Sequence, residues 1–318
     1  MYREPQPGLT HMNIIADSGG LGDAIARLPA IKYVADHHKH IQQHLWIHTY
    51  MKDFAKNCLR NTNVIVRGMD DMERKFVPRL TRMFSKHLFN NMASPITDHA
   101  FQVLVNKTVE LSDMNYLQPD LSKVSLIKFN LPKNYVVICP YWTAPAREFL
   151  GSTINEIAKY IKILGYEVVF LGKKETETGT HHVIVGNVNE EIDFSIGLNL
   201  SDKTNLFETT RILSEAKMVI GLDSGLLHLA GCTDTIIIGG FTSVEPKYRM
   251  PIRHDIRGWK YYPVVPPESL KCRFCQSNMT FTYEKDFKFC YYEDYLCVKQ
   301  LNSILYIEQI EKSLNENP

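Results

Sequence analysis

The sequence predicts an α/β protein with two parallel α/β domains that face each other across a cleft. Short apolar runs alternate with segments of helical periodicity in both halves, which is the pattern of parallel strands joined by crossover helices. Each half also has a glycine-rich or charged loop directly after an apolar run, where open α/β sheets bind their ligands. The 318 residues suffice for two domains, which we expect at 1–130 and 131–300, followed by a helix at 301–318.

Composition narrows the class of protein. Hydrophobic residues make up 44% of the chain and charged residues 22%, as in soluble globular proteins. The formal net charge of +1 provides no global field that would attract nucleic acid. No apolar run is long enough for a transmembrane helix, and the N-terminus lacks the apolar core of a signal peptide. We therefore expect a cytoplasmic protein with no membrane span, and a homo-oligomer is compatible with this composition.

The chain begins with a predicted strand, turn and helix. The strand is expected at Met12–Ala16 and the helix at Ala24–Ala35, with a turn containing three glycines between them. The glycine spacing differs from that of the dinucleotide fingerprint and of the P-loop. Asp23 ends this turn. Its carboxylate is placed either to act as a general base toward a ligand at the sheet edge or only to cap the helix.

Two more strands are predicted in the first half, at Leu45–His48 and Val64–Val66. A basic stretch follows within residues 70–100, and its cations are Arg74, Lys75, Arg79, Arg82 and Lys86. These cations either line a groove for an anionic acceptor or form a solvated helix face.

The second half repeats the alternation. Its predicted elements are a strand at Tyr135–Cys139, a helix at Ile154–Leu164, a strand at Tyr166–Leu171 and a helix at Leu206–Ala216. Arg147 lies in the loop after the first strand, where a guanidinium can neutralise a leaving pyrophosphate. Glu175 or Glu177, beyond the second strand, can hold a ribose hydroxyl.

The segment Met218–Pro246 reads as the centre of the second domain. Its predicted elements are a strand at Met218–Ile220, a turn at Gly221–Gly225, a helix start at Leu226–Ala230 and a strand at Thr235–Ile238. Asp223 and Ser224 can cap the helix, and Gly225 lets a ligand approach the backbone. The helix start suits a phosphate or pyrophosphate, although an ordinary capped helix has the same pattern. A base on one domain facing a pyrophosphate site on the other is suited to moving a group from a nucleoside diphosphate to a hydroxyl.

The cysteines favour metal binding or burial over disulfides, because the chain has seven of them and is expected in the cytoplasm. Four form a CxxC pair and two later positions within residues 268–300: Cys272, Cys275, Cys290 and Cys297. Four thiolates at this density can close a tetrahedral zinc or iron site. The alternative is a set of buried, reduced thiols.

Two motifs resemble signatures of a known family. Gly20–Asp23 followed by Leu28–Ile31 is similar to the N-terminal signature of the bacterial heptosyltransferases, glycosyltransferase family nine. Val219–Ala230 with Gly240–Pro246 is similar to that family's donor-binding signature. The resemblance covers both halves of the chain. It implies a GT-B fold with two Rossmann-like domains, sugar transfer with inversion, and no need for a catalytic divalent metal.

The resemblance also implies roles for individual residues. Asp23 matches the catalytic base, and Arg147 stands where the family often has a lysine, as a second catalytic residue that contacts the phosphates. The residues that it assigns to the nucleotide-sugar donor are Gly20, Gly22, Glu175, Asp223, Ser224, Gly225 and His228.

The C-terminal part resembles one branch of the family, the bacterial autotransporter heptosyltransferases. The similarity lies in the Gly240–Thr242 turn, the CxxC, Asp286–Phe287 and the two later cysteines. This branch implies a structural iron on the four cysteines. The GT-B fold implies that the last helix, Leu301–Leu314, packs back toward the first domain.

We therefore predict an inverting glycosyltransferase that moves a sugar from a nucleotide-diphosphate sugar to a hydroxyl on a protein or glycan. ADP-heptose as the donor is implied by the resemblance alone. One alternative is a phage-type enzyme that glycosylates a hydroxylated base in DNA, for which the basic stretch is the argument. Another is a non-catalytic nucleotide-sugar or nucleic-acid binding module. Such a module would lack a catalytic base, whereas this sequence has Asp23 as a candidate base. A zinc module for nucleic acid is disfavoured by the acidic residues between the cysteines, which include Glu284 and Asp286.

Overall fold

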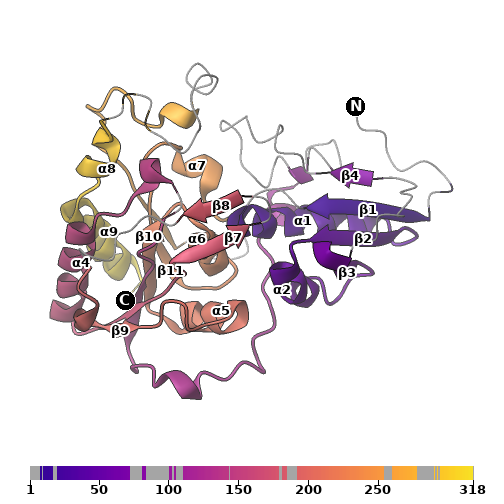
Figure 1. The fold of residues 1–318 in the computed structure, drawn as a ribbon, viewed down its shortest axis with the longest axis horizontal. Coiled ribbons are helices and arrows are strands. Elements are labelled where there is room, and N and C mark those ends of the chain that lie inside the picture. The colour runs from indigo at the N-terminus through magenta and orange to yellow at the C-terminus, as the bar shows by residue number, and fades with distance from the viewer. Residues whose placement is uncertain are drawn as a thin grey trace.

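The computed structural model shows two parallel sheets in separate lobes, with α1 and α6 between them (Figure 1). It describes residues 8, 10–16, 20–71, 81–83, 100–101, 104, 110–142, 144–178, 181–184, 192–253, 260–277, 290, 292 and 294–317. None of the helices in these ranges is long and apolar enough to cross a membrane.

The first lobe is a four-stranded parallel sheet in the order β3-β2-β1-β4. Its elements are β1 (His11–Ala16), α1 (Leu21–His37), β2 (Gln42–Ile47), α2 (Lys52–Cys58), β3 (Ile65–Gly68) and β4 (Thr81–Met83). Ile14 and Leu45 of the sheet are buried in one core with Ile25 of α1 and Phe54 of α2. Burial of apolar side chains, about 1.5–3 kcal/mol each, holds the helices to one face of this sheet.

The second lobe is a six-stranded parallel sheet in the order β12-β11-β10-β5-β6-β9. Its strands are β5 (Tyr135–Ile138), β6 (Glu167–Phe170), β9 (Leu198–Asn199), β10 (Met218–Leu222), β11 (Ile236–Gly240) and β12 (Tyr261–Val264). Its helices are α4 (Gly151–Ile163), α5 (Leu206–Glu215), α6 (Gly225–Ala230), α7 (Pro246–Arg249), α8 (Leu296–Gln300) and α9 (Ser303–Glu316). A separate antiparallel hairpin consists of β7 (Glu175–Thr178) and β8 (His181–Ile184).

The strand order of the second sheet reverses between β5 and β10. From β5 the chain adds β6 and β9 on one side, then returns to place β10, β11 and β12 on the other. Ligands of open α/β sheets bind at the carboxyl edge of such a switch point, because the loops on either side of it diverge there. Arg147, in the 3₁₀ turn η6 (Pro145–Arg147), follows β5, and Asp223 follows β10.

Residues 115–134 join the lobes without a strand and with only a short 3₁₀ turn, η5 (Ile127–Phe129). The side-chain amide of Asn57 in α2 binds the backbone of this linker at Asp120. Its Oδ1 accepts a hydrogen bond from the Asp120 N–H at 2.6 Å, and its Nδ2 donates one to the Asp120 carbonyl at 3.2 Å. The Tyr116 N–H donates to the carbonyl of Ile252 in the second lobe at 2.9 Å. The linker is thus fixed to both lobes.

The structure confirms the alternation of strands and helices in both halves, with three differences. The first helix begins at Leu21, three residues before the predicted Ala24, so that Pro29 lies in its interior. The last helix, α9, packs on α4, β11 and β12 of the second lobe, and the prediction that it returns to the first lobe is wrong. Several observed elements were not indicated by the sequence patterns: the hairpin β7–β8, the strands β4, β9 and β12, and the short helices α2, α7 and α8.

Candidate active site

The start of α1 from the first lobe meets α6 from the second, and two glycines allow the close approach. A Cβ on Gly22 would lie 2.4 Å from Cδ2 of His228, and a Cβ on Gly225 would lie 2.8 Å from Cβ of Leu21. Real Cβ atoms do not come this close to other heavy atoms, so any larger residue would push the helices apart. This contact brings Asp23 of α1 to the switch point of the second sheet.

Asp23 is half-buried and lies in the first turn of α1. Its Oδ2 accepts a hydrogen bond from the Gly20 N–H at 2.9 Å, so the predicted capping role is confirmed. Its charge reaches two neighbours. Partial desolvation, and then the Asp23 carboxylate, raise the pKa of the Tyr50 phenol to about 12. The same carboxylate favours a proton on the imidazole of His228. Asp23 therefore lies within electrostatic reach of Tyr50 and His228 at the junction of the lobes, where a base for a bound ligand would have to lie.

Arg147 and Asp223 bridge the switch point. Nη1 of Arg147 donates to the backbone carbonyl of Asp223 at 3.1 Å and lies 3.3 Å from its Oδ2. The arginine side chain is 26% exposed and the aspartate side chain 7%. The buried Asp223 therefore anchors the guanidinium, and part of the arginine side chain stays accessible to a ligand. A guanidinium held in this way presents its remaining N–H donors in a fixed direction, which suits phosphate oxygens.

The start of α6 differs from the prediction in one respect. Ser224 is the N-cap residue, but its side chain makes no capping hydrogen bond, and the Asp223 carboxylate points to Arg147 instead. The expected side-chain capping by these two residues is therefore wrong. Ser224 and Gly225 are half-buried at the junction of the lobes, beside Leu21.

His228 lies beneath the junction and is 4% exposed. Its Nδ1 is 2.8 Å from the hydroxyl of Tyr116, and its Nε2 is 3.9 Å from Oδ1 of Asp223. Desolvation lowers the pKa of His228, although the carboxylates of Asp223 and Asp23 oppose this. The imidazole is therefore neutral at neutral pH. The sequence patterns did not indicate Tyr116, which lies in a linker with no periodicity to single it out.

Two predicted features cannot be placed in this site. Glu175 begins β7, but its side chain and that of Glu177 lie outside the described residues. The basic stretch Arg74–Lys86 lies outside them too, apart from the backbone of β4.

The four C-terminal cysteines lie near one another. Burial, and then Cys272 and Cys290, raise the pKa of the Cys275 thiol to about 11. Burial, and then the other three cysteines, raise that of Cys297 to about 12. Within the described ranges, however, no group of three or more His, Cys, Asp or Glu side chains is arranged to hold a metal ion. The metal site stays a prediction.

The segment that contains these cysteines supports the loops of the switch point. The N–H groups of Phe274 and Gln276 donate to the carbonyls of Thr242 at 3.3 Å and Ser243 at 2.8 Å. Thr242 Oγ1 in turn donates to the carbonyl of Ala146, next to Arg147. Helix α8 packs on η6 as well. The cysteine segment thus contacts the turn that contains Arg147, directly through α8 and indirectly through Thr242.

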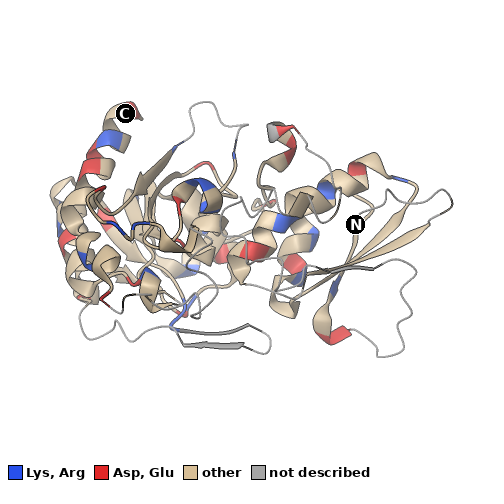
Figure 2. Ribbon diagram, turned by 90° about the horizontal axis from the view of Figure 1, so that it is seen from above, with Lys and Arg blue, Asp and Glu red and all other residues tan. Residues whose placement is uncertain are grey.

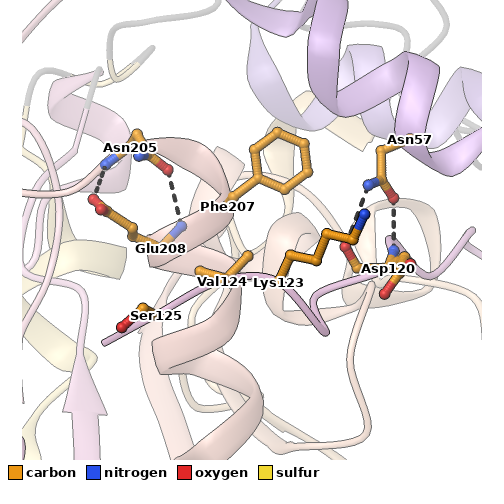
Figure 3. Close-up of a pocket in the computed structure, with 8 residues that line it drawn as sticks. All are labelled: Asn57, Asp120, Lys123, Val124, Ser125, Asn205, Phe207 and Glu208. Atoms are coloured by element: carbon orange, nitrogen blue, oxygen red, sulfur yellow. Dashed lines mark hydrogen bonds between the residues drawn. The ribbon is translucent and has the colours of Figure 1, made fainter. Parts of the chain in front are cut away.

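A cavity of about 540 Å³ lies apart from these residues, between α2, α5 and the linker (Figure 3). Its lining residues are Asn57, Asp120, Lys123, Val124, Ser125, Asn205, Phe207 and Glu208. Asn57 binds Asp120, and Asn205 exchanges hydrogen bonds with Glu208 (Figure 3). None of the predicted site residues is among those that line this cavity, so it is distinct from the predicted site. Figure 2 shows Lys and Arg interspersed with Asp and Glu on the helices of both lobes, consistent with the small net charge.

Sequence comparisons relate this chain to known proteins. The family model of glycosyltransferase family 9 (heptosyltransferase) matches residues 51–262. Lipopolysaccharide heptosyltransferase 2 of Salmonella typhimurium is 24% identical over 113 residues, which are 36% of this chain and 32% of that enzyme. The Escherichia coli K12 enzyme of the same name is 25% identical over 114 residues, again 36% of this chain and 32% of its own length. The aligned part thus spans about a third of these curated relatives.

Solved structures share the fold. The iron-containing dodecameric glycosyltransferase TibC from enterotoxigenic Escherichia coli H10407 has a TM-score of 0.74 at 17% identity, over 98% of this chain and 77% of TibC. The Escherichia coli ADP-heptose lipopolysaccharide heptosyltransferase II has a TM-score of 0.65 at 13% identity, over 96% of this chain and 99% of that enzyme. This chain therefore has the α/β fold of these GT-B-like glycosyltransferases. Because the family match extends over residues 51–262, well over half of the chain, the protein belongs to glycosyltransferase family 9.

Proposed function

We propose that the protein transfers a heptosyl group from ADP-heptose to a hydroxyl of a glycan or protein, with inversion at the anomeric carbon. The observation that carries this proposal is that the charges of Asp23 from the first lobe and of Asp223 and Arg147 from the second all act on the buried His228, and that Arg147 and Asp223 are paired at the switch point. A TibC structure is described as a complex with ADP-D-beta-D-heptose, which supports the choice of donor.

The proposed reaction is a single in-line displacement. Asp23 accepts the proton of the acceptor hydroxyl while the oxygen attacks the anomeric carbon, and the bond to the diphosphate breaks on the opposite face. Arg147 neutralises the charge that develops on the leaving diphosphate. Ser224 and Gly225 offer backbone at the start of α6, and Glu175 holds the ribose. We assign the acceptor to the first lobe, residues 1–130, and the donor to residues 131–300.

We further propose that Cys272, Cys275, Cys290 and Cys297 hold a structural iron or zinc. The donor set suits either metal, because four thiols lie near one another and both zinc and iron bind thiolates. When bound, the metal would close the segment that supports the Arg147 loop. TibC is described as iron-containing and dodecameric, which supports iron and an oligomer here. We place the reaction in the cytoplasm.

The first test is calorimetric binding of ADP, UDP and GDP to the purified protein, followed by a transfer assay with ADP-heptose. We expect ADP to bind selectively and the donor to be consumed when a hydroxyl acceptor is present. Binding without turnover on any glycan or protein acceptor would favour the non-catalytic module. Selective binding of UDP or GDP would overturn the assignment of the donor, and turnover on hydroxylated DNA would move the acceptor to nucleic acid.

A further inference from the structure

Tyr116 connects the linker between the lobes to the buried His228. Its hydroxyl lies 2.8 Å from Nδ1 of His228, and the two rings stack with centroids 5.9 Å apart and planes 19° apart. The backbone of Tyr116 is held by its hydrogen bond to Ile252, and both side chains are buried. The phenol is therefore fixed from both ends against one edge of the imidazole.

The other edge of the imidazole faces the proposed active site. Nε2 of His228 lies 3.9 Å from Oδ1 of Asp223, too far for a hydrogen bond but close enough for a strong electrostatic effect. Gly22 of α1 also lies against this edge, because a Cβ atom added to it would be 3.1 Å from Nε2. The second carboxylate that acts on the ring belongs to Asp23. The imidazole thus separates a phenol on the Nδ1 side from the carboxylate of Asp223 on the Nε2 side.

A neutral imidazole carries its proton on one of the two nitrogens. A bare Nε2 lone pair facing the Asp223 carboxylate would be repelled, whereas an Nε2–H group is attracted to it. The surroundings therefore favour the Nε2–H tautomer, in which Nδ1 is an acceptor and the Tyr116 hydroxyl is its donor.

We propose that Tyr116 is a positioning residue, which holds His228 in the Nε2–H tautomer and thereby orients Asp223 and Arg147. This inference rests on the proposed function, because Arg147 is there the phosphate contact. Asp223 presents Oδ1 to the imidazole and Oδ2 to Nη1 of Arg147, at 3.9 and 3.3 Å. A change of tautomer would turn a lone pair toward Oδ1, displace the carboxylate and remove its contact with the guanidinium, which the Asp223 backbone carbonyl would then hold alone.

The direct test is ¹⁵N NMR of histidine-labelled protein at pH 7.5, with the His228 signals assigned by their loss in His228→Gln. We expect a protonated Nε2 and an unprotonated Nδ1. In Tyr116→Phe, which keeps the stacked ring, we expect a mixture of tautomers, because the donor to Nδ1 is gone. A wild-type His228 that is protonated at Nδ1 or at both nitrogens would overturn the proposal, whatever the variants do.

Binding of ADP supplies the functional readout. We expect Tyr116→Phe to weaken ADP binding by about three- to tenfold, the effect of one hydrogen bond. The glutamine amide of His228→Gln keeps an N–H donor near the Nε2 position and has no tautomer. Tyr116→Phe should therefore add less than about twofold in the His228→Gln background. Unchanged ADP affinity in Tyr116→Phe, or fully additive effects of the two substitutions, would refute the positioning role.

The matched control is Tyr135→Phe. Tyr135 is also buried and its hydroxyl donates to a single backbone carbonyl, that of Ile212, at 2.8 Å, but it stands at the start of β5, away from the site. We expect a comparable loss of stability with unchanged ADP affinity and an unchanged His228 tautomer. If no nucleoside diphosphate binds the wild-type protein, the proposed function fails, while the imidazole spectrum still decides whether Tyr116 sets the tautomer.

Discussion

At the residue scale, Asp23 combines a structural and a proposed chemical role in one carboxylate. Its Oδ2 caps the first turn of α1 through the Gly20 N–H. Its other oxygen, Oδ1, accepts no hydrogen bond from the described part of the chain. A single aspartate can therefore hold its own helix in place and still have an oxygen for the acceptor proton.

The substitution Asp23→Asn separates these roles. An asparagine keeps an oxygen for the Gly20 N–H but is not a base, so we expect turnover to fall by about 10²–10⁴-fold with ADP affinity and melting temperature nearly unchanged. Asp36→Asn in the same helix removes an exposed carboxylate paired with Lys32 and serves as the control. Steady-state kinetics with ADP-heptose and calorimetry with ADP give the two readouts. Full activity in Asp23→Asn would exclude this residue as the base.

At the element scale, the contact between α1 and α6 sets the geometry of the site, and Gly22 is its tightest point. In Gly22→Ala the new methyl group would meet the ring of His228 at 2.4 Å, and this ring is buried and bound to the Tyr116 hydroxyl. Overpacking of about 1–3 kcal/mol outweighs a gain in helix propensity of about 1 kcal/mol. We expect a net loss of stability in urea unfolding.

Gly20→Ala is the matched control for this prediction, because its Cβ would meet no atom within 4 Å. It changes an N-cap residue, where alanine is less favourable than glycine by up to about 1 kcal/mol, so its unfolding midpoint measures the cost of an added methyl group without a clash. Equal unfolding midpoints for Gly22→Ala and Gly20→Ala would show that the helices adjust freely at this contact.

The cysteine segment gives a second prediction at this scale. In Cys297→Ser we expect loss of bound metal, because a hydroxyl is a poor replacement for a thiolate ligand. We also expect weaker ADP binding, because α8 and residues 274–276 support the loop that ends at Arg147. Metal content by mass spectrometry and calorimetry test these outcomes, with the buried Cys58→Ser as control. A wild-type protein purified without metal would count against the site, and lost metal with unchanged turnover would make it dispensable.

The sequence predicted elements far better than contacts between them. The strand predicted at Tyr135–Cys139 is observed at Tyr135–Ile138. It could be predicted because an unbroken apolar run of this length is typical of a parallel strand that is buried on both faces. The motifs around Asp23 and Asp223 were recognised locally, and the fold then brought them together. Tyr116 was missed because its role depends on His228, more than a hundred residues away, and no local pattern encodes such a pairing. The predicted capping of α6 by Asp223 was wrong for the same reason. The carboxylate contacts Arg147, which lies far away in the sequence, and not the start of the helix.

At the scale of the whole molecule, each lobe contains a histidine whose pKa is lowered. Desolvation, and then Arg67 and His11, lower the pKa of His44 in the first lobe. In the second lobe, desolvation is the main cause of the lowered pKa of His228. The unfolded chain binds a proton at each imidazole near pH 6.5, whereas the folded chain binds it only at a lower pH. Stability is therefore fully present above about pH 6.5 and is lost as the pH falls from there toward the folded pKa values.

We thus expect the free energy of unfolding, measured in urea, to fall between pH 7 and pH 5.5, before most carboxylates titrate. The buried His228 alone contributes a slope of up to about 1.4 kcal/mol per pH unit, because it differs by up to one proton between the two states. His228→Gln should flatten the profile markedly and His44→Gln less so, since His44 is only half-buried. His40→Gln replaces an exposed imidazole and should keep the wild-type slope. A wild-type profile that is flat over this range, or an equal slope in His228→Gln, would mean that His228 already carries a proton in the folded protein, and the neutral imidazole beneath the lobe junction would have to be abandoned.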